Sequence, residues 1–174
     1  VGADTLKGGT SNDTITVLNA GEANSDTIDG GAGTDILQLS SGAHTITTDN
    51  KLLNIESIKA HSSGSITDFS NQSENLTIVG AAGSDTLKGG AGNDTLTGGA
   101  GADTFNVSAG TDTISDLQTS DILIVASGAI ANASAISTFT ATGSTTNSGT
   151  VNLTAVSGGA TINVASASGG YNLI

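Results

Sequence analysis

Four aspartates in the second half of the chain recur at a fixed interval and have the chemistry to bind a metal ion. Asp85, Asp94, Asp103 and Asp112 are nine residues apart; glycines precede each one, and an apolar residue follows two positions later. Glycine adopts positive φ at no steric cost, so such segments curl and bring backbone carbonyl oxygens together. A hard dication such as Ca²⁺ takes roughly six to eight oxygen ligands from carboxylates and carbonyls. The spacing therefore predicts calcium loops with one carboxylate each.

Short strands must position these loops. The three residues after a loop, such as Thr86-Leu87-Lys88, suffice for one short strand whose side chains alternate between two faces. We expect the apolar residues to point inward and the threonines outward. The inward set is Leu87, Leu96, Phe105 and Ile114, and the outward set is Thr86, Thr95, Thr104 and Thr113. The chain turns back after each nonapeptide, which predicts an all-β coil with two nonapeptides per turn.

The segment 80–114 fits the nonapeptide G-G-x-G-x-D-x-U-x and so resembles the RTX repeat proteins, for which this calcium-binding pattern is typical. The resemblance implies a right-handed parallel β-roll, or β-helix, in which Asp85 shares an ion with Asp103, and Asp94 with Asp112. Loop residues of both partners add backbone carbonyls. The implied loop positions are Gly89, Gly90, Ala91, Gly92, Gly98, Gly99, Ala100 and Gly101.

A looser copy of the pattern begins the chain. Asp4 and Asp13 are nine apart, as are Asp26 and Asp35, but residues 17–20 add four positions between the pairs. The resemblance then pairs Asp4 with Asp26 and Asp13 with Asp35. Ser11 replaces one loop glycine and residues 22–24 replace most of another loop, whereas residues 30–35 form a regular loop. That loop contributes Gly30, Gly31 and Gly33.

The pattern divides the chain into four segments. We expect a first RTX block at 1–39, a calcium-free β-helical spacer at 40–79, a second block at 80–125 and a C-terminal β-rich cap or secretion region at 126–174. Asp116 and Asp121 follow the last repeat in a stretch that resembles the closing segment of RTX arrays. They either complete the final calcium site or cap the open edge.

The spacer and the tail show alternating apolar residues, which indicate strands, including one at 53–58 in the spacer. In the spacer, residues 53–58 resemble an Asn-Ile-Glu segment of secreted RTX proteins, and Glu56 is expected to accept a hydrogen bond from a neighbouring rung. His44 and His61 have no motif partners, which favours surface positions. In the tail, residues 157–159 suggest a hairpin between strands at 150–156 and 160–165.

The composition indicates the class of partner. The chain carries four lysines against sixteen acidic residues, a formal charge of −12, and it lacks cysteine. Such a surface disfavours nucleic acid and anionic membrane, and its self-repulsion predicts folding coupled to calcium binding. No apolar run approaches the roughly 20 residues of a membrane span. Val1 lies within a repeat rather than in a signal peptide, which suggests a piece of a longer polypeptide.

Two functions fit these features. The first is a calcium-dependent structural protein of a bacterial surface layer that self-associates into a sheet or filament. Its upstream region would supply an anchor to a cell-surface polysaccharide. The alternative is the C-terminal folding and secretion module of a secreted enzyme, toxin or adhesin. Both imply type I secretion from a Gram-negative cell and an extracellular or cell-surface location. Threonine rows on a flat solenoid can also bind ice, but these rows are few and interrupted. No catalytic motif is present, so we expect no enzymatic activity.

Overall fold

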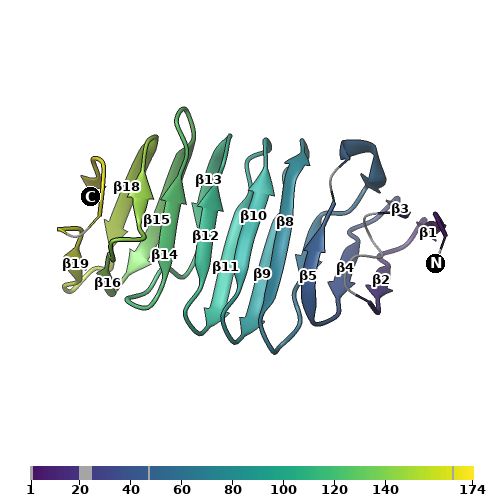
Figure 1. The fold of residues 1–174 in the computed structure, drawn as a ribbon, viewed down its shortest axis with the longest axis horizontal. Helices are drawn as coiled ribbons and strands as arrows, with labels where there is room; N and C mark the ends of the chain where they lie inside the picture. The colour runs from purple at the N-terminus through teal and green to yellow at the C-terminus, as the bar shows by residue number, and fades with distance from the viewer. Residues whose placement is uncertain (1, 20–24, 47, 166) are drawn as a thin grey trace.

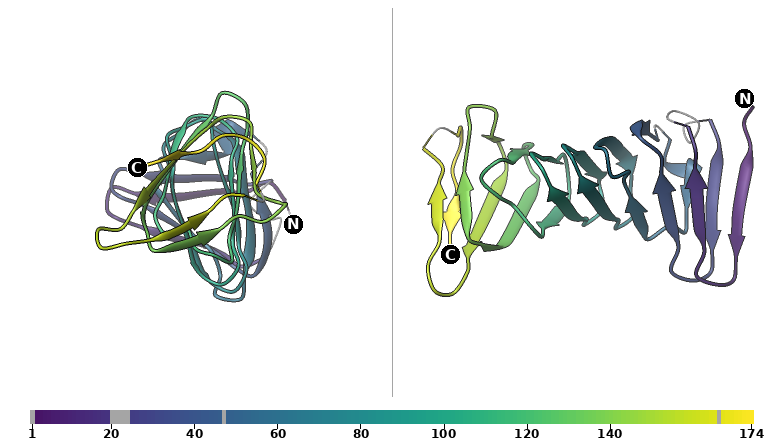
Figure 2. Two further views of the ribbon diagram at one scale, coloured as in Figure 1. Left: turned by 90° about the vertical axis from the view of Figure 1, so that its left-hand side faces the viewer. Right: turned by 90° about the horizontal axis from the view of Figure 1, so that it is seen from below.

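The chain folds into an elongated stack of β-strands. The structure, a computed structural model, describes residues 2–19, 25–46, 48–165 and 167–174. The strands follow one another along a single long axis, and the two termini lie at opposite ends (Figure 1). Viewed along the axis, the successive turns of the coil overlie one another (Figure 2). The predicted all-β parallel solenoid is confirmed. Residue 20, the last of the four added positions, and residues 22–24, which replace most of a loop, lie outside the described residues.

One parallel sheet extends through all four predicted segments. Its nine strands are stacked in the order β2, β4, β7, β9, β11, β13, β15, β18 and β20. Their bounds are β2 Thr14–Val17, β4 Ile36–Leu39, β7 Ser57–Lys59, β9 Thr77–Ala82, β11 Thr95–Ala100, β13 Thr111–Ile114, β15 Ile130–Ile136, β18 Thr150–Ala155 and β20 Asn172–Leu173. The spacer and the tail therefore continue the same coil as the repeats.

Two shorter sheets alternate with this long one along the chain. The first has three strands, β1 Thr5–Gly9, β3 Thr27–Gly31 and β6 Leu52–Leu53. The second has six, β5 Gly42–Thr45, β8 Ser65–Gln72, β10 Thr86–Gly90, β12 Thr104–Val107, β14 Ile122–Val125 and β17 Thr146–Asn147. A 3-10 turn, η2 at Asp49–Lys51, precedes β6, and β16 Thr138–Thr140 pairs with β19 Thr161–Asn163 in the tail.

The core consists of apolar side chains stacked in register. Leu87 lies beside Phe105, and Phe105 beside Leu123. On the long sheet, Leu96 stacks on Ile114. All of these side chains are fully buried, which confirms the predicted inward set. Thr86, Thr95 and Thr104 are partly exposed and Thr113 is exposed, as alternation along a strand requires.

Three local predictions are wrong. No hairpin forms at 157–159, because β18 pairs in parallel with β15 and β20 whereas β19 pairs with β16. The stretch 53–58 is not one strand, since Asn54 takes φ +52° and separates β6 from β7. His44 is buried rather than exposed. It lies two positions before the buried Ile46, so the strand period places both on the inner face.

Candidate metal-binding loops

The loop carboxylates form two rows along the solenoid. A first carboxylate ladder contains residues at the start of strands of the nine-stranded sheet: Asp13, Asp35, Glu56, Asp94 and Asp112. A second carboxylate ladder contains the residues that precede strands of the six-stranded sheet: Asp85, Asp103 and Asp121. Asp4 and Asp26 lead into the three-stranded sheet. Because the sheets are parallel and in register, equivalent loops lie directly above one another.

One oxygen of each ladder aspartate after Asp13 accepts a hydrogen bond from the backbone of the preceding rung. The N–H of Asp85 donates to Asp103 Oδ1 (2.9 Å), and that of Asp94 donates to Asp112 Oδ1 (3.0 Å). In the first block the corresponding bonds join Asp4 N to Asp26 Oδ1 (3.0 Å) and Asp13 N to Asp35 Oδ1 (2.7 Å). The structure thus brings together the aspartates of all four predicted pairs.

The second carboxylate oxygen is buried and has no hydrogen-bond partner in most of these residues. This holds for the Oδ2 atoms of Asp13, Asp35, Asp94, Asp103 and Asp112. Burying a charged carboxylate costs several kcal/mol of folding free energy unless a hydrogen bond or an opposite charge compensates for the lost hydration. These oxygens therefore fit a bound cation, which would supply the missing partner.

Backbone carbonyls reach the same space as these oxygens. A side-chain carbon built on Gly80 would lie 2.8 Å from Asp85 Oδ2 and would overlap the Gly98 carbonyl oxygen. At Gly89 and Gly98 such a carbon would overlap the Oδ2 atoms of Asp94 and Asp103. The first glycine of each repeat is thus required by the carboxylate five residues later. Among the described residues no three acidic or histidine side chains gather at one point, so carbonyls would supply further ligands.

The other loop positions stack backbone on backbone. A carbon at Gly99 or Gly101 would overlap the carbonyl oxygen of Ala81 or Gly83, and Gly101 has φ +144°, which side chains rarely adopt. Ala91 N donates to Gln72 O (2.8 Å) and Gly83 N donates to Ala100 O (2.8 Å). The same close stacking onto a neighbouring carbonyl occurs at Gly90, Gly92, Gly31 and Gly33.

Burial and neighbouring charge favour protonated carboxyls in the loops. Burial raises the pKa of Asp94, Asp103 and Asp121, and it raises the pKa of Asp112 to about 7. Neighbouring carboxylates raise the pKa of Asp103 and Asp112 further. A bound cation would oppose both effects, because it stabilises the charged form.

The segment after the last repeat covers its loop. Both oxygens of Asp116 accept backbone N–H groups, from Gly98 (2.8 Å) and Gly99 (2.7 Å). Asp121 Oδ1 accepts from Asp103 N (3.0 Å) and Oδ2 from Gln118 N (2.8 Å). Asp116 thus lies over the loop at Gly98 and Gly99, and Asp121 extends the second carboxylate ladder by one rung; whether they complete a calcium site stays a prediction.

An asparagine ladder beside the aspartates was not foreseen. Asn93 N donates to Asn75 Oδ1 (2.7 Å), Thr111 N to Asn93 Oδ1 (2.9 Å) and Thr34 N to Asn12 Oδ1 (2.9 Å). The signal was present in the sequence, since asparagine directly precedes Asp13 and Asp94. These amides fix the loop backbone next to the carboxylates.

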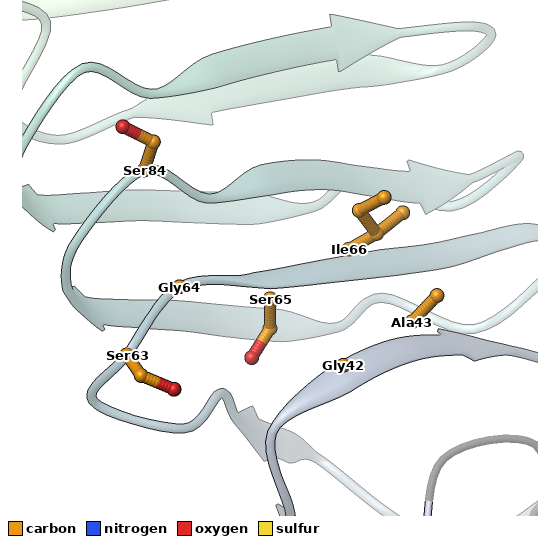
Figure 3. A pocket seen from close by; sticks show the side chains of 7 residues that line it. All are labelled: Gly42, Ala43, Ser63, Gly64, Ser65, Ile66 and Ser84. Carbon is orange, nitrogen blue, oxygen red and sulfur yellow. The ribbon is translucent and has the colours of Figure 1, made fainter.

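A shallow pocket lies where the second carboxylate ladder gives way to the spacer. Gly42, Ala43, Ser63, Gly64, Ser65, Ile66 and Ser84 line it (Figure 3). Ser65 occupies the ladder position here, and its N–H donates to Asp85 Oδ1 (2.6 Å). None of the seven lining residues has an ionisable side chain, so the pocket offers only hydroxyl, apolar and backbone contacts.

Comparison with known families agrees with this geometry. A family model described as the RTX calcium-binding nonapeptide repeat matches at 1–17, 20–43 and 79–114. No curated protein and no solved structure matches the chain. Within the described residues, no helix is long and apolar enough to cross a membrane. Glu56, Asp116 and Asp121 lie outside the matched segments. The chain therefore carries four copies of the RTX calcium-binding nonapeptide repeat, in two blocks separated by an unmatched spacer.

Proposed function

We propose that the chain is a calcium-binding structural protein that folds outside the cell when calcium fills its loops. The observation that carries this proposal is the set of five buried, unpartnered Oδ2 atoms in the carboxylate ladders. Four of them, those of Asp13, Asp35, Asp94 and Asp103, lie against a loop glycine, and a neighbouring carbonyl oxygen reaches the same space at Asp13 and Asp35. Calcium prefers such oxygen ligands, and its charge would offset the burial of the carboxylates.

The low number of basic residues supports an external cation. The chain has four lysines and a formal charge of −12. Lys88 pairs with Asp68 (3.6 Å), a residue outside both ladders, and Lys51 donates to the Ser25 carbonyl (2.9 Å). The ladder carboxylates therefore depend on ions from solution for neutralisation. Calcium that binds only the folded chain stabilises it by mass action.

Secretion follows from the same coupling. RTX repeats are typical of type I-secreted extracellular proteins, and extracellular calcium sites have dissociation constants on the order of 0.1 to 1 mM. In the calcium-poor cytosol the repeats would remain unfolded and able to pass a narrow channel. Outside the cell, calcium would drive them into the solenoid.

Self-association into a surface layer is the role that we favour, and it involves no catalytic step. Among the described residues the outermost strands of the nine-stranded sheet are β2 and β20, and an outermost strand can pair with a strand of another chain. Leu18 follows β2 and is 75% exposed, and Leu173 lies in β20 and is 59% exposed. In a folding and secretion module, by contrast, β2 would stack on a rung of an upstream domain.

Calcium titration tests the metal claim. We expect isothermal calorimetry to show several bound ions and circular dichroism to show a gain of β signal as they bind. Asp94→Asn should raise the calcium midpoint, the calcium concentration at which half of the β signal is gained, several-fold, because it removes a charged oxygen from the first carboxylate ladder. Asp68→Asn, outside the ladders, should leave the midpoint unchanged. Equal midpoints for both variants would contradict the proposal.

Light scattering and electron microscopy test the assembly role. With calcium we expect sheets or filaments that a chelator dissolves into monomers. Monomers at every calcium concentration would reject the assembly role and favour the alternative, a C-terminal module of a secreted enzyme, toxin or adhesin.

A further inference from the structure

The spacer contains a shortened copy of a calcium loop. Asn54, Ile55 and Glu56 connect β6 to β7, outside the segments that match the RTX repeat. Leu53 pairs with Asp29, and Ser57 pairs with Ile36. Asn54 therefore stacks on Gly30 and Glu56 on Asp35. A loop of three residues thus occupies the position that six residues, 30–35, occupy one rung below.

Glu56 makes the hydrogen bond of a ladder aspartate. Asp35 N donates to Glu56 Oε2 (2.7 Å), as Asp13 N donates to Asp35 Oδ1 (2.7 Å) one rung earlier. Asn54 closes the tight loop at φ +52°, and its Nδ2 donates to Asp29 Oδ1 (2.7 Å). The extra methylene of glutamate compensates for the missing loop residues, so its carboxylate still reaches the ladder.

The oxygens of this loop converge as they do in the repeats. Asp35 is 0% exposed and its Oδ2 has no hydrogen-bond partner. A side-chain carbon built on Gly30 would lie 2.6 Å from this Oδ2 and would overlap the Asn54 carbonyl oxygen. A carbon built on Gly8 would likewise lie 2.7 Å from Asp13 Oδ2 and would overlap the Gly30 carbonyl oxygen. The spacer thus reproduces, with Asn54, the carbonyl that a glycine supplies in the repeat.

We propose that Asp35, Glu56 and the Asn54 carbonyl hold a divalent cation, calcium in the secreted protein, between the first block and the spacer. Two carboxylates balance its charge, and residues 30–35 add carbonyl oxygens. The first spacer rung then binds metal, contrary to the expectation of a calcium-free spacer. This inference rests on the proposed calcium-binding function. Because the spacer loop is shorter, it has fewer carbonyls to offer, so this site is weaker than those of the second block.

The experiment counts calcium ions per chain by equilibrium dialysis at about 5 mM free calcium, well above the usual range for extracellular sites. Glu56→Gln keeps an acceptor for Asp35 N–H but removes the charge. The variant therefore distinguishes the side chain's role in hydrogen bonding from its role in cation binding. We expect this variant to lose one ion per chain. The matched control is Glu74→Gln in the same spacer. Glu74 Oε2 accepts only from the adjacent Ser73 N–H among the bonds described (3.2 Å), so this variant should keep every ion.

The outcomes separate the two proposals. If Glu56→Gln binds as many ions as the wild type with the same affinities, Glu56 is a hydrogen-bond acceptor alone and the spacer site is rejected. If the wild type binds no calcium, the proposed function itself fails. Should Glu56→Gln not fold, carbon NMR of the wild type decides. The Asn54 carbonyl and Glu56 carboxylate signals are expected to shift on calcium addition, and a shift confined to the second block would overturn the inference.

Discussion

At the scale of single residues, five of the loops pair an aspartate with the glycine five positions before it, at Gly8, Gly30, Gly80, Gly89 and Gly98. The aspartate uses Oδ1 to hold the backbone of the neighbouring rung, as Asp103 accepts from Asp85 N (2.9 Å). Its Oδ2 is packed against the glycine, where any side chain would overlap it. The glycine is therefore required for close approach, since none of Gly80, Gly89 and Gly98 has a positive φ.

Replacing such a glycine should be costly. In Gly89→Ala the new methyl group would overlap Asp94 Oδ2 and displace a calcium ligand. We expect a loss of about 1 to 3 kcal/mol in the free energy of unfolding, as for other overpacked sites, together with a higher calcium midpoint. Urea unfolding in saturating calcium measures this. Gly143→Ala is the control, because nothing lies within 4 Å of its added carbon, and it should be neutral or slightly stabilising. Equal effects would refute the close-approach argument.

The buried carboxyls should also make the calcium-free protein sensitive to pH. The pKa of Asp112 is raised to about 7 by burial and by Asp94, against roughly 4 in an unfolded chain. A raised pKa means that the folded state holds its proton more tightly. The stabilisation is complete below about pH 4 and is lost as the pH rises through 7. Calcium-depleted protein should thus keep β signal in circular dichroism at pH 4 to 5 and lose it toward pH 8. Asp112→Asn should flatten this dependence, and a signal that instead grows with pH would contradict it.

The sequence was informative about residues wherever the period was kept. The nine-residue spacing, together with the resemblance to RTX repeats, allowed the aspartate pairs to be predicted, and parallel rungs place these residues side by side. Glu56 could not be recognised as a ladder member, since the loop before it has lost three residues and its glycines. What reveals it is the register between β4 and β7, in which Ser57 pairs with Ile36.

At the scale of elements, stacking in register explains both the successes and the failures. The inward residues of each short strand followed from alternation, and Phe105 lies between Leu87 and Leu123 as expected of a solenoid core. The strand pairing of the tail was harder to predict, because its Ser, Gly and Ala residues indicate turns without showing which sheet the chain enters next. The predicted hairpin is a connection from β18 in the nine-stranded sheet to β19 in the two-stranded sheet, and β18 pairs with β15 instead.

Core stacking should dominate the stability of these elements. Phe105 is fully buried, and Phe105→Ala would leave a cavity between Leu87 and Leu123. We expect a loss of about 3 to 5 kcal/mol in the free energy of unfolding, measured by urea denaturation in saturating calcium. Thr113→Ala, on the exposed face of β13, serves as the control and should cost less than about 1 kcal/mol. A loss for Phe105→Ala as small as that of the control would show that the metal sites, not the core, hold the strands together.

At the scale of the whole molecule, net charge and metal binding act together along one axis. The formal charge of −12 is distributed over a long stack of strands. Some of the aspartates that carry it are buried in the loops, where salt in the solvent screens them little. Monovalent salt reduces repulsion between exposed charges over a Debye length of about 8 Å at 0.15 M, but it provides no ligand partner for a buried oxygen.

Calcium and salt should therefore have different effects on the size of the chain. We expect small-angle X-ray scattering to show an expanded chain at pH 7.5 without calcium. Adding about 5 mM calcium, a concentration above the usual dissociation constants of extracellular sites, should produce the compact elongated stack. Potassium chloride at the same ionic strength should leave the chain expanded, because it screens charge without coordinating the Oδ2 atoms. Compaction by potassium chloride alone would mean that general repulsion, rather than coordination in the ladders, keeps the calcium-free chain unfolded.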